Sequence, residues 1–388
     1  MPRVQLERAP GWLLVVLAVL AGLTCQLLLG TSYVAASLDP LREEAGVPVA
    51  VVNLDAGPHG DQLVARLQQT RSPVLWVEYA DRSAALEALA QKRLFGALVL
   101  PTNFSADLDS FASDRPRAAL VETFANPGAS TAGGLIAQRA LELAVEATRD
   151  AAREGALQSA TLGTTGLGAL TLEQGRYLAE PVHVRHSEVN AVPPRTANGL
   201  APTYLAMAAW IGGYLGAAAL ERFRPQTGLH PLARGGIVAA AAFAQGALAT
   251  VVVVSIGFAA RDPLELALVL GLGTWMAYAL VSLLMDLFGL AGILPAFAVL
   301  ALGLPAAGAI YPVGLLPPLF ADLHAVDPFT WLVEGLRTTL YAPGASDLAA
   351  HMGALAALAL SCTLASVLLG FLRGRRSRRA ASPSGEGL

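Results

Sequence analysis

Long apolar runs alternate with polar segments along the whole chain. Six of these runs contain about 20 apolar or small residues each, and they cover residues 11–30, 203–220, 235–259, 264–284, 289–310 and 352–372. A helix of that length rises about 1.5 Å per residue and crosses a hydrocarbon core about 30 Å thick. The pattern therefore predicts an α-helical integral membrane protein with six transmembrane helices.

The first apolar run has two interpretations. Arg3 and Arg8 precede it, as they would in a secretory signal peptide. Its apolar stretch is longer, however, than the roughly 7–15 residues of the hydrophobic region in such a signal. We therefore expect an uncleaved membrane anchor at residues 11–30.

The segment 31–200, between the first two runs, has the pattern of an α/β domain. Short apolar stretches bounded by turn residues predict strands at 47–53, 74–79, 94–100, 118–124 and 181–192. Helical patterns lie between them at 60–70, after a cap at Asp81 or Ser83, and at 131–155. We expect the Gly- and Thr-rich segment 155–175 to be loosely ordered. Alternation of strands and helices predicts right-handed crossovers and a partly parallel sheet.

Charge predicts the orientation of the spans. Only 14% of residues are charged and 54% are apolar, whereas a soluble domain carries about 25% charge. Five arginines follow the last run (Arg373, Arg375, Arg376, Arg378 and Arg379), and the segment 221–234 carries three more (Arg222, Arg224 and Arg234). Arginine clusters mark the cytoplasmic side. We therefore expect residues 1–10 and the basic tail 373–388 to lie on the cytoplasmic side of a cell membrane. The α/β domain is expected on the opposite, extracytoplasmic side.

The segment 311–351, between the last two runs, predicts a re-entrant or interfacial helical hairpin. Asp327 is a good helix N-cap and Pro328 suits the first helical position. An apolar face then follows at Phe329, Leu332, Val333, Leu336 and Leu340, with Trp331, Glu334 and Thr338 roughly opposite. We interpret this hairpin as an external gate in which Glu334 and Arg337 either pair or face a partner. The alternative is an amphipathic helix lying on the outer leaflet.

Arg222, Arg224 and Arg234 also have two interpretations. They are candidates for the loop that couples the membrane domain to a cytoplasmic ATPase. Alternatively, they set the topology and meet anionic lipid headgroups. We interpret the arginine tail after residue 372 as topogenic and lipid-facing.

Signals for chemistry within the chain are weak. Asn53 and Asp55 follow the first strand, where an open α/β sheet can bind a ligand, although such residues more often shape the turn. His183 and His186 point to opposite faces of a strand, which disfavours a metal site. The spans carry no central charged residue for proton relay, and the chain has no phosphate-binding loop. We predict no catalytic residue, metal or cofactor in this chain, so a transporter built on it requires energy from a partner.

Three motifs and the residues that open the second span suggest a family. They are Val49-Ala-Val-Val-Asn-Leu-Asp55 with Gly57 and Gly60, the segment 93–105, the run from Tyr311-Pro312 through Leu316-Pro-Pro-Leu-Phe320 to Asp327–Arg337, and Asn198–Pro202. Together they resemble the phage-infection-protein (YhgE/Pip) branch of ABC-2-type membrane proteins, from about residue 10 to 372. The resemblance implies a permease-like subunit that is typically dimeric and paired with a separate ATPase. This chain's outer domain is more compact than in many such proteins, which weakens transfer of receptor or scaffold roles.

Three functions follow as hypotheses. The leading one is the membrane subunit of an ATP-driven exporter of a hydrophobic or amphiphilic cargo, working as a homodimer or heterodimer in the lipid bilayer without a nucleic-acid partner. The second is an envelope scaffold or receptor that acts through the outer domain. The third, a membrane-anchored enzyme, would need a catalytic constellation that the sequence does not present.

Overall fold

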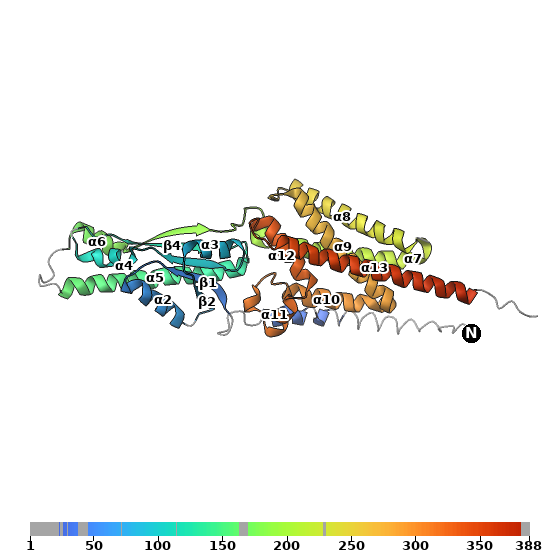
Figure 1. Ribbon diagram of the computed structural model, residues 1–388, viewed down its shortest axis with the longest axis horizontal. Coiled ribbons are helices and arrows are strands. Elements are labelled where there is room, and N and C mark those ends of the chain that lie inside the picture. The colour runs from blue at the N-terminus through green and yellow to red at the C-terminus, as the bar shows by residue number, and fades with distance from the viewer. Residues whose placement is uncertain are drawn as a thin grey trace, which may run out of the picture.

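The structure is a computed structural model that describes residues 23, 26–28, 30–37, 46–70, 72–113, 115–162, 170–227 and 230–381. The molecule is elongated, with an α/β domain at one end and a helical domain at the other (Figure 1). The side chains of residues 160–162, 222–227 and 374–381 lie outside this description. Most of residues 11–30, the first predicted span, also lie outside the described part of the chain. Residues 30–36, from its last residue onward, are helical.

The α/β domain is built on a five-stranded mixed sheet in the order β2-β1-β3-β4-β5. Its strands are β1 (Val47–Asn53), β2 (Val74–Glu78), β3 (Gly96–Leu100), β4 (Ala119–Ala125) and β5 (Val182–Glu188). β1 is parallel to β2 and to β3, β3 is antiparallel to β4, and β4 is parallel to β5. All five residues of β3 are buried, because helices cover both faces of the sheet. The five predicted strands and the partly parallel sheet are confirmed.

Helices of different length cover the two faces. Side chains of α2 (Pro58–Gln69) and α5 (Thr131–Leu162) pack on one face, and those of α3 (Arg82–Ala90) pack on the other. The short α4 (Phe104–Leu108) lies on the same side as α2 and α5. The expectation of loose order over 155–175 is wrong where the chain is described: α5 continues to Leu162, and α6 (Leu172–Ala179) begins with a capping box between Thr171 and Gln174.

The helical domain contains α7 (Ala201–Thr227), α8 (Pro231–Ser255), α9 (Pro263–Phe288), α10 (Ile293–Ala306) and α13 (Leu348–Ala381). Among the described residues, four helical stretches are long and apolar enough to cross a membrane: Ala201–Glu221, Pro231–Ser255, Pro263–Ala306 and Leu348–Arg373. The third contains both α9 and α10. The chain reverses at Gly289–Gly292, where Gly292 lies against the Leu284 carbonyl. With 14 residues, α10 is only about 21 Å long.

One predicted loop is wrong. The segment 221–234 was expected to connect two spans as a loop, but α7 continues to Thr227 and α8 begins at Pro231. No helix-breaking residue stops α7 at Glu221, because Pro225 is the first proline after that position. The connection is therefore short, and Arg222 and Arg224 lie on helix α7.

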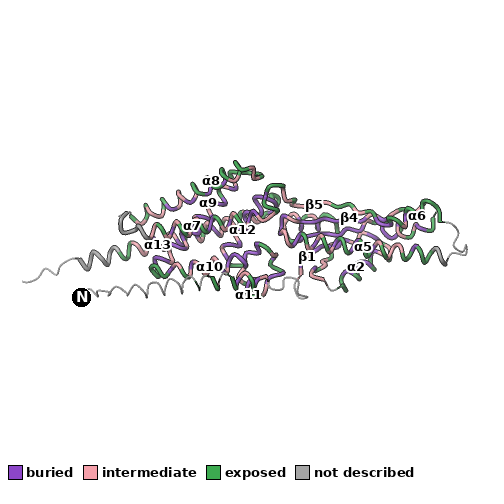
Figure 2. Tube along the Cα trace, turned by 180° about the vertical axis from the view of Figure 1, so that it is seen from behind, coloured by how far each residue is buried: buried purple, intermediate pink, exposed green. Residues whose placement is uncertain are grey.

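Small residues let the long helices approach closely. Gly246 of α8 lies against the backbone of Gly271 in α9, where any side chain would collide. The opposite face of α8 exposes large apolar side chains, among them Leu248, Val251 and Val252. In Figure 2 the trace of α8 is accordingly coloured as exposed along parts of its length. Close backbone contact on one face and exposed apolar side chains on the other are typical of helices packed in lipid.

The segment between α10 and α13 contains two helices, α11 (Pro318–His324) and α12 (Pro328–Tyr341). α11 packs on α10 and not along α12, so the predicted hairpin of two paired helices is not observed. α12 contacts α7, α9, α10 and α13. Phe329, Leu332, Val333 and Leu336 are fully buried, and so are polar residues on its other side, such as Thr338. A helix lying on the leaflet surface would leave one face exposed. The burial of α12 therefore disfavours the leaflet-surface alternative.

Candidate functional site

The site begins at a strained turn where α3 ends, at the edge of the α/β domain nearest the helical domain. Lys92 has a φ of 59°, in the left-handed region that favours glycine. Its N–H donates to the Leu89 carbonyl (3.0 Å), and the N–H of Arg93 donates to the Ala88 carbonyl (2.9 Å), which is the Schellman arrangement. Glycine usually fills this position, so a lysine there indicates a side chain with a role of its own.

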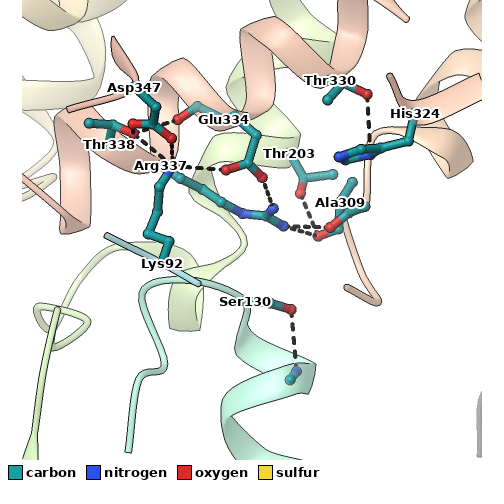
Figure 3. Close-up of polar contacts among 12 residues, drawn as sticks. Lys92, Ser130, Thr203, Ala309, His324, Thr330, Glu334, Arg337, Thr338 and Asp347 are labelled. Atoms are coloured by element: carbon teal, nitrogen blue, oxygen red, sulfur yellow. Dashed lines mark hydrogen bonds and ion pairs between the residues drawn. The ribbon is translucent and has the colours of Figure 1, made fainter. Parts of the chain in front are cut away.

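The ammonium group of Lys92 has three acceptors, all on the helical domain (Figure 3). Its Nζ lies 2.8 Å from Oε2 of Glu334, 2.8 Å from Oγ1 of Thr338 and 2.8 Å from Oδ2 of Asp347. An ammonium carries three N–H donors, so each has one partner. The side chain is only 6% exposed, which makes this a buried, fully paired cation. We call Lys92, Glu334, Arg337, Thr338 and Asp347 the ionic junction.

Glu334 extends the ionic junction toward the membrane helices. Its second carboxylate oxygen accepts from Arg337, one turn along α12. Burial tends to raise the pKa of Glu334, but the charges of Arg337 and Lys92 outweigh it and lower that pKa to about 2. Arg337 also donates to the carbonyl of Gly308 (2.6 Å) and to that of Ala309 (3.3 Å), just after α10. The predicted pairing of Glu334 and Arg337 is thus present, with Lys92 as an additional partner.

The start of α13 is held by the same turn of the α/β domain. Gln91 donates to the Gly344 carbonyl (3.1 Å) and accepts from the N–H of Ser346 (3.0 Å), beside the contact of Lys92 with Asp347. Thr338 donates to Asp347 at 2.9 Å. Burial tends to raise the pKa of Asp347, but hydrogen bonds from His351 and Lys92 outweigh it and lower that pKa. Two consecutive residues of one domain therefore hold both α12 and the start of α13.

The other predicted gate residues lie near the ionic junction but outside it. Asp327 caps α12 by accepting from the N–H of Thr330 (3.1 Å), and Pro328 occupies the first turn. Burial raises the pKa of Asp327 to about 6. Trp331 is partly buried against the core of the helical domain. Asp327 and Pro328 thus start the helix, while Glu334 and Arg337 make its polar contacts.

An apolar contact joins the two domains a second time. Leu315, from the segment between α10 and α11, is 1% exposed and belongs to the core cluster of the α/β domain together with Val47 and Val74. The next residue, Leu316, packs instead with Ala306 and Phe320 in the helical domain. The segment that leads from α10 to α12 is therefore anchored in both cores.

An apolar cavity of about 210 Å³ lies beside the ionic junction. Its walls come from the end of the first helix, the start of α7 and the end of α10, and they include Tyr33, Thr203, Met207 and Ala309. Thr203 donates to the Ala309 carbonyl (3.1 Å), the same carbonyl that accepts from Arg337. One wall of the cavity is thus bonded directly to the ionic junction (Figure 3).

Asn53 and Asp55 have different surroundings. The Asn53 amide donates to Asp61 (2.8 Å), and both line a polar groove of about 550 Å³ between α2 and the ends of β1 and β2. Asp55 is buried and accepts from the N–H of Ser105 (3.1 Å) and the N–H of Gly60 (3.3 Å). The carboxylate of Asp55 therefore fixes the turn, and the Asn53 side chain lies in the groove.

Charged pairs also link the helices at the end far from the α/β domain. Arg234, near the start of α8, pairs with Glu221 of α7. Arg373, near the end of α13, lies 3.2 Å from Oδ1 of the buried Asp286 in α9. The helix positions of Arg222 and Arg224 are described but their side chains are not, so the structure does not place them within or outside this cluster.

The comparisons with known proteins come from sequence and from structure. The sequence model of the ABC-2 family transporter proteins matches residues 12–368. The chain belongs to this family. Membership together with several long apolar helices supports a membrane location and a permease role. No curated protein matches the chain.

One solved structure shows limited similarity. It is the crystal structure of a domain assigned to an ABC type-2 transporter of Thermotoga maritima MSB8. The two chains are 15% identical, the match covers 36% of this chain and 84% of the other, and the TM-score is 0.24. At that score the likeness carries no argument about this protein.

Sequence reasoning missed Lys92, Asp347 and the carbonyl groups of Gly308 and Ala309. These groups come from elements far apart in the chain, so no local spacing connects them with Glu334 and Arg337. One signal was present: Lys92 is the only lysine, while the other 25 basic residues are arginines. A lone lysine in such a background marks a position where an arginine does not serve.

Proposed function

We propose that this ABC-2 family protein is the membrane subunit of an ATP-driven exporter of the phage-infection-protein (YhgE/Pip) branch. It moves a hydrophobic or amphiphilic cargo outward, together with a separate cytoplasmic ATPase and a second permease subunit. In this proposal the α/β domain lies on the extracytoplasmic side of the cell membrane. The helix ends near Arg234 and Arg373 lie on the cytoplasmic side.

The observation that carries the proposal is a membrane domain of the ABC-2 family in a chain without an ATP-binding loop. The family match spans both domains. A phosphate-binding loop needs a lysine followed by Ser or Thr, and the chain's only lysine, Lys92, is followed by Arg93. Energy for transport therefore has to come from another subunit.

The linked helix ends suit the transmission of an ATPase movement. Glu221 with Arg234 and Asp286 with Arg373 connect α7 to α8 and α9 to α13. A force on the α7–α8 connection would reach α9 through its packing against α7 and α8, and α13 through the pair of Asp286 with Arg373. At the opposite end, the ionic junction joins α12 and the start of α13 to the α/β domain. Polar contacts thus join the helices to one another at one end and to the α/β domain at the other. This arrangement supports the proposal that a movement at the ATPase side is transmitted to the outer side.

The test is a pull-down of tagged protein in mild detergent from its native membrane, analysed by mass spectrometry. We expect a cytoplasmic ATPase with a phosphate-binding loop in stoichiometric amount, and its release by the double substitution Arg222→Ala and Arg224→Ala. Arg261→Ala, between α8 and α9, is the matched control and should leave the ATPase bound. Recovery of envelope or secretion components without an ATPase would instead favour the scaffold or receptor function.

A further inference from the structure

The apolar cavity beside the ionic junction has the properties of a ligand site. Its volume is about 210 Å³ and its lining is mainly apolar, with Met207, Leu304 and Ile310 among the side chains. Hydroxyl groups of Tyr33, Thr203 and other lining residues supply a few polar positions. Small-molecule sites typically combine an apolar wall with a small number of polar groups. Apolar cavities of about 150 Å³ already bind a ring the size of benzene, so this one is large enough for a segment of alkyl chain.

The exposed surface next to the cavity indicates which molecule would enter. Tyr204 lines the cavity and is 52% exposed. Ile211 and Leu215 are also exposed and follow on the same face of α7, at helical spacing. This apolar stripe continues from the cavity along the helix, where a membrane-spanning helix meets lipid. A ligand with an alkyl chain can therefore pass from the bilayer into the cavity without crossing water.

Hydrogen bonds tie the cavity wall to the α/β domain. The Ala309 carbonyl, in the wall, accepts from Thr203 (3.1 Å) and from Arg337 (3.3 Å). Arg337 is paired with Glu334, and Glu334 accepts from Lys92. Movement of the wall would therefore displace a carbonyl group that accepts from Arg337. Movement of the α/β domain would in turn shift the position of the wall through Lys92, Glu334 and Arg337.

We infer that this cavity binds one alkyl chain of an amphiphile, whose polar head contacts hydroxyl groups of the lining, and that the ionic junction controls the cavity wall. The inference rests on the proposed export function for its biological meaning, since it names the substrate class and its site. Binding itself requires neither an ATPase nor transport.

The test uses the full chain in lipid nanodiscs and a fatty acid with a photoactivatable diazirine near its end. After illumination, cross-linked peptides are mapped by mass spectrometry over a range of probe concentrations. We expect labelling of the segments 200–207 and 304–316 that saturates and that unlabelled fatty acid competes away. Labelling around Leu248, on the exposed face of α8, should rise without saturation because it reports bulk lipid. Non-saturating labelling at the cavity as well would overturn the inference.

Filling the cavity separates a site from general lipid contact. Met207→Trp and, separately, Ser37→Trp place a large side chain in the lining, and Leu248→Trp is the matched control outside it. Saturable labelling should fall about tenfold in both cavity variants, the factor that about 1.4 kcal/mol of lost binding gives. Saturable labelling that persists in both cavity variants contradicts the site.

The coupling to the ionic junction has its own measurement. Lys92→Gly replaces none of the residues that line the cavity, so a change in the probe concentration at half-saturation supports control by the ionic junction. An unchanged value removes that part of the inference. Failure of the site and failure of the exporter proposal are distinguishable: an ATPase recovered without saturable labelling contradicts the cavity alone, whereas saturable labelling without any ATPase contradicts the exporter alone.

Discussion

The Nζ atom of Lys92 lies 2.8 Å from the carboxylate of Glu334, and through this pair a turn of the α/β domain is joined to a helix buried among the membrane helices. The pair is enclosed, with Lys92 6% and Glu334 17% exposed. Two cations, Lys92 and Arg337, face two anions, Glu334 and Asp347. Removal of either partner would leave the ionic junction with one excess buried charge, so the two domains depend on each other for stability.

Replacement of Lys92 by glycine changes stability in two opposite ways, through relief of backbone strain and through loss of the ammonium group. Glycine accepts the left-handed φ of 59° and should return about 1 kcal/mol of strain. Loss of the ammonium leaves Glu334 with Arg337 as its remaining cation and removes the lysine partner of Asp347, and breaking a buried ion pair typically costs about 3–5 kcal/mol. We therefore expect Lys92→Gly to lower the melting temperature in detergent and to speed amide exchange in α12.

Lys92→Arg is the matched control for charge. The guanidinium is planar and presents its donors as a fork, so it cannot direct three N–H groups from one atom to Glu334, Thr338 and Asp347. We expect this variant to recover only part of the stability that Lys92→Gly loses. A Lys92→Gly variant as stable as the wild type, with unchanged exchange in α12, would show that the ionic junction does not hold the domains together.

The two acidic partners of Lys92 should differ in importance. Glu334 faces both Lys92 and Arg337, whereas Asp347 is 34% exposed and can draw on water. We expect Glu334→Gln to cost about 3–5 kcal/mol in the free energy of unfolding, as breaking a buried pair does, and Asp347→Asn to cost clearly less. Chemical unfolding of both variants in detergent measures the difference, and equal losses would contradict this ranking.

Much of the fold follows from local patterns, and the ionic junction does not. The strand predicted at 47–53 is observed as β1. Its apolar run is followed by the turn residues Asp55, Gly57 and Pro58, so the local sequence marks where the strand ends. Asp327 and Pro328 marked the start of α12 by the same kind of local rule. Lys92 meets Glu334 only because α3 ends beside α12 in space, and no periodicity encodes that contact. The extension of α5 to Leu162 was missed because the glycine at 155 weakens a helix without ending one.

Leu315 should stabilise the contact between the domains, and Leu316 should not. Leu315 is buried in the core of the α/β domain, while Leu316 packs within the helical domain. We expect Leu315→Ala to cost about 2–5 kcal/mol, as for other buried leucines, and to make the α/β domain more sensitive to limited proteolysis. Leu316→Ala is the neighbouring control and should leave the proteolysis of that domain unchanged. The same cleavage pattern in both variants would contradict the separate packing.

Asp327 predicts a specific dependence of stability on pH. Burial raises its pKa from 3.8 to about 6 in the folded protein. A raised pKa means that the stabilising contribution is fully present below about pH 4 and is lost as the pH rises through about 6. Asp327→Asn keeps an oxygen acceptor for the N-cap but cannot titrate. The difference in unfolding free energy between wild type and variant should therefore change by on the order of 3 kcal/mol between pH 4 and pH 8. Glu334, with its pKa lowered to about 2, adds a slope of the opposite sign near pH 4, where the unfolded carboxyl still titrates, but this slope is the same in both proteins and cancels in the difference. A difference curve that is flat from pH 4 to 8 would mean that Asp327 is solvated in the folded protein.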